Sequence, residues 1–399
     1  MTKLRSSSMQ FAPGRVDRRR FLSIGVAGLA VACLPKISIA QAAEGYRRLL
    51  VLVELKGGND ALNTVVPYAD PAYYSLRPRL AIRRDDVIQL DERTGLNPVL
   101  SPLAPMWQAK DLAIVQGVGY PQPNLSHFRS IEIWETASKA DEFLTEGWLA
   151  RAFVAKPAPA GFAADGVVVG SSELGPLHGQ GTRTIALNET EQFLRQAKLA
   201  GGAAKRGNAA LNHILKVQDD IAQAASHLNS NVAFRTEFPK NAFGNAVRTA
   251  AQIAANPAGV CAIRLTLNGF DTHRNQPAVH QRLLQELGEG IAALKSALVE
   301  VDRWNSTLVM TYAEFGRRPQ ENNSNGTDHG TAAAHFVAGG LVRGGLYGQA
   351  PRLDRLESGN LPYAVDFRSL YATALERWWG SPSQGPLRGR YPTIDLLKV

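Results

Sequence analysis

One apolar run near the start of the chain restricts the fold most. Residues 49–55 read Leu-Leu-Val-Leu-Val-Glu-Leu, so a strand formed here would be apolar on both faces. A strand of that kind is buried on both sides, which is typical of a parallel sheet with helices packed on each face. The run therefore predicts an internal strand of such a sheet.

Further apolar runs alternate with amphipathic stretches along the chain. Strands are expected at residues 112–115, 167–169, 184–187, 261–267 and 307–312, and helices at 102–110, 126–134, 208–228, 246–255 and 283–301. This alternation predicts an α/β fold on a mostly parallel sheet. Hydrophobic residues make up 45% of the chain, enough for a large core in one or two domains. A helical insert at about 189–258 is the candidate for a cap or subdomain.

The N-terminus carries the features of an export signal. Residues 17–22, Asp-Arg-Arg-Arg-Phe-Leu, precede an apolar run at 24–34 that is too short to span a bilayer, and Ser-Ile-Ala at 38–40 offers a cleavage site. Adjacent arginines before Phe-Leu resemble the signal read by the twin-arginine translocase, which exports folded proteins. We therefore expect a signal peptide at 1–40, a mature chain at 41–399 and a periplasmic or secreted location. A basic N-terminal arm and lipid anchoring at Cys33 are the alternatives.

The positive charge of the chain comes mainly from this N-terminal segment. The whole chain has 44 Lys and Arg against 35 Asp and Glu, but residues 1–40 hold seven of these bases and one acid. The expected mature chain keeps 37 bases and 34 acids, a net charge of +3. The composition therefore argues against nucleic acid as a partner, and no transmembrane helix is expected in the mature chain.

Polar side chains follow four of the expected strands at the point where each strand ends. Because the carboxyl ends of parallel strands lie at one edge of a sheet, where such folds carry their ligand sites, we expect these side chains to converge. They are Asp60 after the first run, Asn124, Ser126 and His127 after 112–115, Asp271 and His273 after 261–267, and Glu314, Asp328 and His329 after 307–312. The densest segment is 326–335, Gly-Thr-Asp-His-Gly-Thr-Ala-Ala-Ala-His, which holds two of the eight histidines.

Aspartate and histidine in one place point to a divalent metal. Mixed ligands of this kind suit zinc, manganese or iron, whereas an all-oxygen set would favour calcium. Two divalent ions about 4 Å apart can stabilise the attacking and leaving oxygens of a phosphate or sulfate ester. We therefore expect one or two ions, zinc or manganese ahead of magnesium or calcium, and an anionic ester, small or borne on a polymer, as substrate.

A simpler interpretation treats each of these residues as local structure. Asp60 and Ser126 would then be helix caps, and residues 271–273 would be a turn. In the same interpretation, residues 326–335 would form a capped polar loop, with His335 buried along the helix that follows.

Six short motifs lie between about residues 48 and 380. They are Gly-Gly-Asn-Asp at 57–60, Asn-Leu-Ser-His-Phe at 124–128, Gly-Phe-Asp-Thr-His at 269–273, Glu-Phe-Gly-Arg at 314–317, Asp-His-Gly at 328–330 and Gly-Gly-Leu-Tyr-Gly at 344–348. Together they resemble an exported bacterial family called domain of unknown function 1501. That family is grouped with the alkaline-phosphatase-like hydrolases, which include sulfatases. The resemblance implies a three-layer α/β/α sandwich of the alkaline-phosphatase-like kind.

The resemblance also implies roles for individual residues. Asp60, Asp328 and His329 match the ligands of one ion, Asp271 matches a ligand of a second ion, and Ser126 matches the nucleophile. The second set is incomplete, because His273 follows Asp271 by two residues where the superfamily has four, and no histidine follows His335. Either His335 serves as the missing ligand or the second site is altered, so a one-metal or inactive protein is also open.

Four further residues are assigned from their positions. His127 is a candidate general base, metal ligand or phosphate contact. A direct bond between His127 and Ser126 is not expected, because neighbours on a helix point about 100° apart. Asn124 and Arg317 are candidate contacts to the substrate, Arg317 as a fork for non-bridging ester oxygens. His280 is a reserve candidate for a metal ligand.

Two classes of function fit these features. The first is an exported metal-dependent hydrolase of phosphate or sulfate esters with a serine nucleophile. The sulfatase run C/S-x-P-x-R is absent, which favours phosphate. The second is a non-catalytic exported envelope or binding protein that retains the fold.

The export signal can be tested directly. Replacing Arg18, Arg19 and Arg20 by Lys should leave precursor in the cytoplasm, because the twin-arginine signal is read by a receptor rather than through bulk charge. Cell fractionation with immunoblotting measures this, and Arg15→Lys is the matched control. Unchanged export of the triple variant would mean that another pathway is used.

Overall fold

The computed structural model describes residues 45–187 and 232–399, which lie within the unit Ala42–Val399. The main element of this part of the chain is a nine-stranded sheet, with the order β13-β5-β12-β9-β1-β8-β6-β7 and β14 beside β5. Its strands are β1 (Leu49–Lys56), β5 (Leu112–Gly119), β6 (Ala164–Val169), β7 (Thr184–Leu187), β8 (Val260–Asn268), β9 (Thr307–Tyr312), β12 (Ala333–Ala338), β13 (Gly345–Gly348) and β14 (Val365–Asp366). The expected signal peptide, the expected helix at 208–228 and much of the expected insert lie outside the described residues.

The sheet is mostly parallel, and β1 lies near its centre. Only β12 runs antiparallel to its neighbours, β5 and β9. Val51 of β1 pairs with Ile263 of β8 on one side and with Val309 of β9 on the other. The side chains of β1 alternate between two buried clusters, with Leu49, Val51, Val53 and Leu55 in one and Leu50 and Leu52 in the other. The run at 49–55 is thus buried on both faces, as its sequence predicts.

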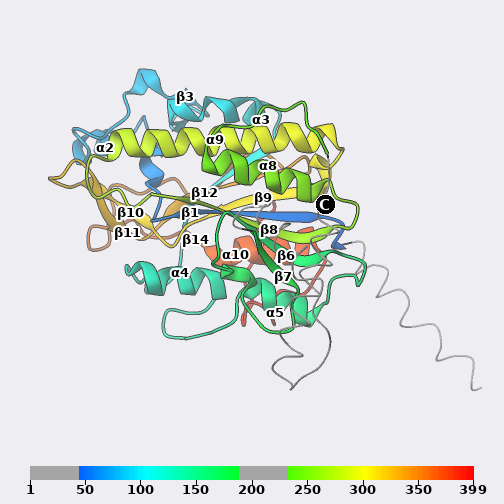
Figure 1. The fold of residues 1–399 in the computed structure, drawn as a ribbon. Coiled ribbons are helices and arrows are strands. Elements are labelled where there is room, and N and C mark those ends of the chain that lie inside the picture. The colour runs from blue at the N-terminus through cyan, green and yellow to red at the C-terminus, as the bar shows by residue number, and fades with distance from the viewer. Residues whose placement is uncertain (1–44, 188–231) are drawn as a thin grey trace, which may run out of the picture. The chain divides into compact units, whose positions relative to one another are not determined.

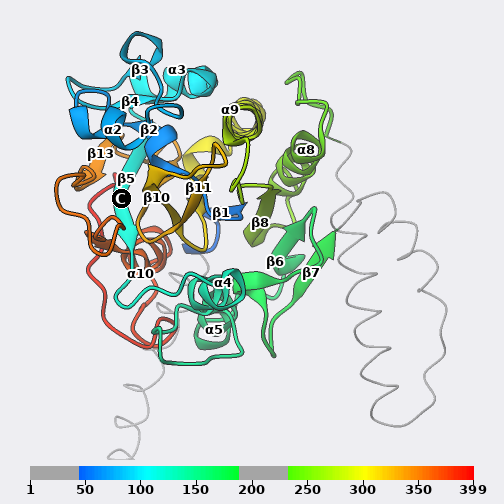
Figure 2. The ribbon, with the colours of Figure 1, turned by 90° about the vertical axis from the view of Figure 1, so that its left-hand side faces the viewer.

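Helices cover both faces of the sheet (Figure 1). On one face lie α3 (Ala104–Gln108), α8 (Ala242–Ala254) and α9 (Gln276–Glu300), and on the other lie α4 (His127–Thr136), α5 (Trp148–Ala155) and α10 (Phe367–Ala372). Figure 2 shows the same separation, with α8 and α9 on one side of β1 and β8, and α4 and α5 on the other. Val247 and Leu287 pack in the first buried cluster, and Trp134 and Leu370 in the second. The predicted three-layer α/β/α sandwich is confirmed.

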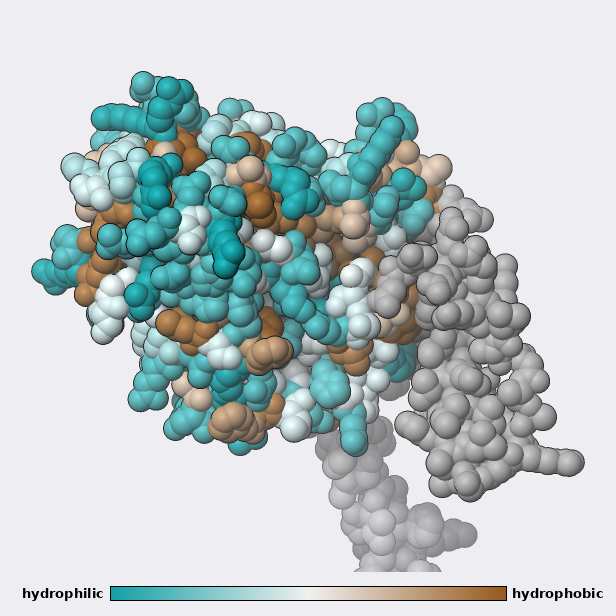
Figure 3. All heavy atoms as spheres, turned by 60° about the vertical axis from the view of Figure 1, so that its left-hand side comes forward, coloured by the Kyte–Doolittle hydropathy of each residue, from teal (hydrophilic) through white to brown (hydrophobic). Residues whose placement is uncertain are grey.

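Smaller elements complete the described part of the chain. They are α2 (Pro71–Leu76), the sheet of β2 (Val65–Val66), β3 (Ile88–Gln89) and β4 (Gly95–Leu96), the antiparallel pair β10 (Gly316–Glu321) and β11 (Thr327–Gly330), 3₁₀ turns at Ala61–Asn63, Arg84–Asp86, Pro98–Leu103, Gly175–Leu177 and Trp304–Ser306, and a π-helical turn at Thr373–Trp378. The side that carries β10 and β11 comes forward in Figure 3. It is mostly hydrophilic, with small separate hydrophobic areas.

The expected strands are all present, and the helix expected at 283–301 begins earlier, at Gln276. The simpler interpretation of residues 326–335 is wrong, because this segment forms β11 and the start of β12 and not a loop leading into a helix. Within the described residues, no helix is both long and apolar enough to cross a membrane.

A buried ion pair joins β1 to β8 within the central sheet. Glu54 Oε2 accepts hydrogen bonds from Arg264 at 2.6 Å and from Thr266 at 3.0 Å, and neither side chain of the Glu54–Arg264 pair is exposed. Arg264 also donates to the hydroxyl of Tyr312 on β9 at 2.8 Å. Three neighbouring strands are therefore joined by one guanidinium, whose removal would leave a buried carboxylate without its cation.

Replacing Arg264 by Met should lower the free energy of unfolding by about 3–5 kcal/mol, the usual cost of breaking a buried ion pair from one side. Urea unfolding followed by circular dichroism measures this. Arg282→Met, which breaks an exposed pair with Glu286 at 3.3 Å, should cost less than about 1 kcal/mol. Equal costs for the two variants would contradict the structural role given to the buried pair.

Candidate metal centre

The buried guanidinium of Arg317 holds several strand ends together. Its side chain is fully buried and donates to Gly57 O, Gly58 O at 2.8 Å, Thr327 O at 2.9 Å, Phe270 O at 3.0 Å and Asp271 Oδ1 at 2.7 Å. These acceptors belong to the segments that follow β1 and β8 and to the start of β11. All three guanidinium nitrogens are used within the protein. The expectation that Arg317 contacts the substrate is therefore corrected: it positions Asp271 instead.

Glycine at position 57 allows these segments to approach each other. Gly57 has a φ of +114°, and a Cβ added there would lie 2.4 Å from the backbone nitrogen of Asp271. Any larger residue would therefore push the segment after β8 away from β1. The motif at 57–60 thus fixes the place of Asp271.

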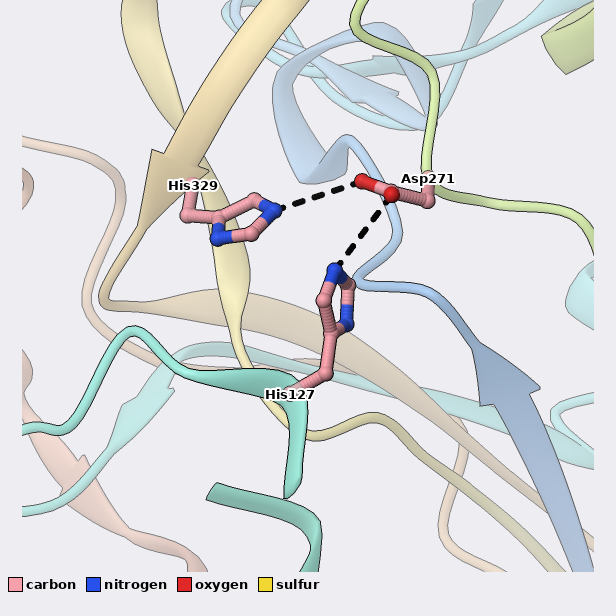
Figure 4. A group of neighbouring side chains, drawn as sticks. All are labelled: His127, Asp271 and His329. Carbon is pink, nitrogen blue, oxygen red and sulfur yellow. Dashed lines mark hydrogen bonds and ion pairs between the residues drawn. The ribbon is translucent and has the colours of Figure 1, made fainter. Parts of the chain in front are cut away.

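Three side chains from separate elements meet at this edge of the sheet (Figure 4). His127 begins α4, Asp271 follows β8, and His329 lies on β11. One ligand atom of each lies within 4.8 Å of the others. His127 Nε2 is 3.4 Å from Asp271 Oδ2, and His329 Nε2 is 3.3 Å from Asp271 Oδ1. We call these three residues the candidate metal centre, or the centre.

The ring of His127 is oriented by a buried carboxylate. Its Nδ1 lies 2.9 Å from Oε1 of Glu314, which also accepts a hydrogen bond from Gly57 N at 2.9 Å. The hydrogen bond and charge of Glu314 raise the pKa of His127 despite the opposing effect of burial. Because Nδ1–H donates to Glu314, Nε2 is left facing Asp271, and it has no hydrogen-bond partner. Metal-binding histidines are commonly held by a carboxylate in this way.

The ring of His329 is oriented by a backbone carbonyl. Its Nδ1 lies 2.8 Å from Leu125 O, so Nδ1 carries the proton and Nε2 keeps its lone pair. Burial lowers the pKa of His329, aided by the charge of Arg317 and against the hydrogen bond to Leu125. The neutral ring with a free Nε2 is the form that binds a metal ion.

The carboxylate of Asp271 supplies the negative charge of the centre. Burial acts to raise its pKa, but the hydrogen bond and charge of Arg317 outweigh this, with help from His273 and His127, and the pKa is lowered. Its side chain is 46% exposed, so the ionised carboxylate remains accessible. An ionised carboxylate and the Nε2 atoms of two imidazoles are donors of the kind that a zinc or manganese ion accepts.

His273 and Asp328 adjoin the centre. His273 Nε2 lies 2.9 Å from His329 Nε2 and 3.0 Å from Asp271 Oδ1, while its Nδ1 is 3.5 Å from Asp328 Oδ1. Ligands of one tetrahedral ion with bonds of 2.0–2.2 Å lie about 3.3–3.6 Å apart, so His273 Nε2 lies closer to these two atoms than a fellow ligand would, and His273 is not one of the three residues that could share an ion. Asp328 is the more exposed partner and also accepts from Asn322 at 3.1 Å.

Asp60 is not one of the three residues of the centre. Its carboxylate is fully buried, pairs with Arg77 at 2.6 Å and accepts from Gln276. Burial acts to raise the pKa of Asp60, but the charge and hydrogen bond of Arg77 outweigh it and the pKa is lowered. The set expected from the resemblance, Asp60 with Asp328 and His329, therefore differs from the group that the structure gathers, because Arg77 already neutralises Asp60.

Two other candidate histidines are buried away from the centre. His335 lies on β12, with its ring 5.3 Å from that of Trp134 and its Nδ1 3.4 Å from the hydroxyl of Thr311. Burial lowers the pKa of His335 to about 3. The structure does not bring it to the ligand group, since Trp134 belongs to the core on the α4 face. His280 is also buried, and its Nε2 lies 2.9 Å from Asn59 Oδ1.

Ser126 lies at the border of the centre. It is the exposed residue before the first turn of α4, its hydroxyl makes no capping bond, and its backbone nitrogen donates to Asn124 Oδ1 at 2.8 Å. The residues on either side, Leu125 and His127, both belong to the centre or orient it. The side chain of Asn124 therefore shapes this turn by accepting a backbone hydrogen bond.

Two supporting residues were given no role from the sequence. Glu314 was expected only to lie at a strand end, and the position of Gln276 in the sequence gives no sign of its role.

The family model for proteins of unknown function designated DUF1501 matches residues 93–381 of the chain. No curated protein sequence matches the chain.

Several solved structures are similar to the chain at low identity. They include the zinc complex of the C-terminal periplasmic domain of EptC from Escherichia coli, with 9% identity, a TM-score of 0.37 and coverage of 73% of this chain and 72% of that one. The alkaline phosphatase from the Antarctic bacterium TAB5 has 12% identity and a TM-score of 0.34, over 73% and 91% of the two chains. The lipoteichoic acid synthase LtaP from Listeria monocytogenes has 8% identity and a TM-score of 0.32, over 77% and 67%.

The purified mature protein should bind at least one transition metal ion, and His127→Ala and His329→Ala should each weaken that binding. The affinity for the ion should fall further than the about 10–100-fold that is usual when a residue supporting a metal ligand is replaced. Calorimetric titration with Zn²⁺ or Mn²⁺ measures the affinity, and His178→Ala, an exposed histidine elsewhere, is the control. If all three variants bind the ion equally, the ligands are other residues.

Proposed function

The chain belongs to the family described as protein of unknown function (DUF1501), and we propose that it is an exported metal-dependent hydrolase of phosphate esters. The observation that carries the proposal is the pair of imidazoles, His127 and His329, whose Nδ1 atoms are occupied while both Nε2 atoms face the carboxylate of Asp271. Both Nε2 atoms are thus turned toward one ionised carboxylate, as they would be around a bound cation.

His127, Asp271 and His329 would hold the ion, with His273 beside them. A divalent ion there would neutralise part of the ester's negative charge and polarise the bond to the leaving oxygen. Zinc and manganese suit the two nitrogen donors better than magnesium or calcium, which prefer oxygen. Asp328 stands next to His273, where it can accept a hydrogen bond from a substrate group or from water.

Ser126 is the nucleophile in this proposal. Its exposed hydroxyl is not engaged as a cap, and it precedes a ten-residue helix whose first N–H groups have no partner within the helix. Such N–H groups favour a bound anion. Attack of Ser126 Oγ on phosphorus would release the alcohol together with the serine proton and leave a phosphoserine. Water would then release inorganic phosphate and restore the hydroxyl.

The substrate class follows from charge and surface. The side of the molecule that carries β10 and β11 is mostly hydrophilic (Figure 3), as befits a charged ester on a small molecule or on a polymer. The proposed location is the periplasm or the exterior, reached through the twin-arginine translocase. Sulfate esters share the same shape and charge type, and the missing sulfatase run places them second.

Ser126→Ala should reduce hydrolysis of an aryl phosphate by orders of magnitude while metal content stays at the wild-type level. The substitution should cost less than the about 1 kcal/mol of a lost helix cap, because no capping bond is present. Release of p-nitrophenol measures turnover, with aryl sulfate assayed in parallel and Ser296→Ala, an exposed serine on α9, as control. Retention of most activity would assign the attack to water, and metal binding without turnover of either ester would favour a non-catalytic binding protein.

A further inference from the structure

The side-chain amide of Gln276 contacts both segments that carry the histidines and carboxylates of the site. Gln276 is the first residue of α9 and is almost completely buried. Its Oε1 accepts hydrogen bonds from the hydroxyls of Thr272 at 3.1 Å and Thr327 at 2.7 Å. Its Nε2 donates to Asp60 Oδ2. The amide oxygen of Gln276 thus accepts from the two threonines, and its NH₂ group donates to Asp60.

The two threonines stand beside the metal ligands in the chain. Thr272 lies between Asp271 and His273, and Thr327 immediately precedes Asp328 and His329. The backbone adds one direct link, from Thr327 N to Thr272 O at 3.2 Å. Because both hydroxyls donate to the same Oε1, that atom constrains the distance between the two segments together with the backbone bond and Arg317.

Asp60 and Arg77 keep the amide in one orientation. Arg77 is fully buried and donates to Asp60 Oδ2 at 2.6 Å, Asn63 Oδ1 at 2.8 Å, Pro319 O at 2.7 Å and Arg318 O at 3.0 Å. The ionised carboxylate accepts only, so the amide must turn its NH₂ group to Asp60 and its oxygen to the threonines. Arg77 is thus the cation partner of the aspartate that follows β1.

We propose that Gln276 is a positioning residue, anchored by the Asp60–Arg77 pair, that sets the spacing of Asp271 and His273 relative to His329. The inference rests on the proposed function, since it concerns the same candidate metal centre. Gln276 does not touch the ion or the substrate. It acts through Thr272 and Thr327. Without it the two segments keep one backbone hydrogen bond, their shared contact with Arg317 and the contacts among the site's own side chains.

The test compares Gln276→Leu with Gln285→Leu, the same substitution at an exposed position of α9. Metal-free protein is titrated with Co²⁺, and both the affinity and the visible absorption spectrum of the bound ion are recorded, since the spectrum reports ligand geometry. Gln276→Leu should weaken binding by about 10–100-fold, as other supporting residues do, and should change the spectrum. Gln285→Leu should match wild type in both.

Each outcome separates this inference from the proposed function. If the wild type binds no Co²⁺, the proposed function fails. If the wild type binds Co²⁺ and Gln276→Leu has the same affinity and spectrum as Gln285→Leu, only the positioning role is overturned. Should Gln276→Leu fail to fold, Thr327→Val applies the same test, because it removes one bond to the amide and leaves Asp60 and Arg77 paired. An unchanged Co²⁺ spectrum in Thr327→Val would equally contradict the proposal.

Discussion

The buried guanidinium of Arg317 is the interaction on which the site depends. A cation with no exposed surface is costly to bury unless its charge and its donors are matched. Here Asp271 supplies the charge, and carbonyl groups of the segments after β1 and β8 and of Thr327 accept the remaining donors. Satisfying one cation therefore requires several strand ends to lie at fixed distances from each other. The position of the Asp271 carboxylate, and with it the site, follows from that requirement.

Two aspartates follow parallel strands, yet they end in different environments. Asp60 is sealed against Arg77 with no exposed side-chain surface, whereas Asp271 shares Arg317 but keeps 46% of its side chain exposed. The first is therefore a fixed internal anion that orients Gln276, and the second is an anion free to bind a ligand. This difference favours the single ion proposed at His127, Asp271 and His329 over two ions.

The three layers of the fold and the edge of the sheet that carries the site were predictable from the sequence. Local patterns such as residues 49–55 indicate strands that are buried on both faces and paired in parallel. The choice between Asp60 and Asp271 was not predictable. It depends on Arg77, because no sequence pattern marks this arginine as the partner of Asp60. It also depends on which carboxylate each buried arginine contacts in the folded chain. The role of His335 also depends on the fold, since its small neighbours fit a loop, a helix or the buried strand β12 equally well. Glu314 and Gln276 act through hydrogen bonds that sequence spacing does not reveal.

The most direct test of a single centre at His127, Asp271 and His329 is anomalous diffraction from crystals of the zinc-loaded protein at the zinc absorption edge. One strong peak is expected within about 2.0–2.2 Å of both Nε2 atoms and an oxygen of Asp271, with Asp60 still paired to Arg77. A peak bound by Asp60, or an ordered site with no peak between the two histidines, would contradict a single centre at these residues.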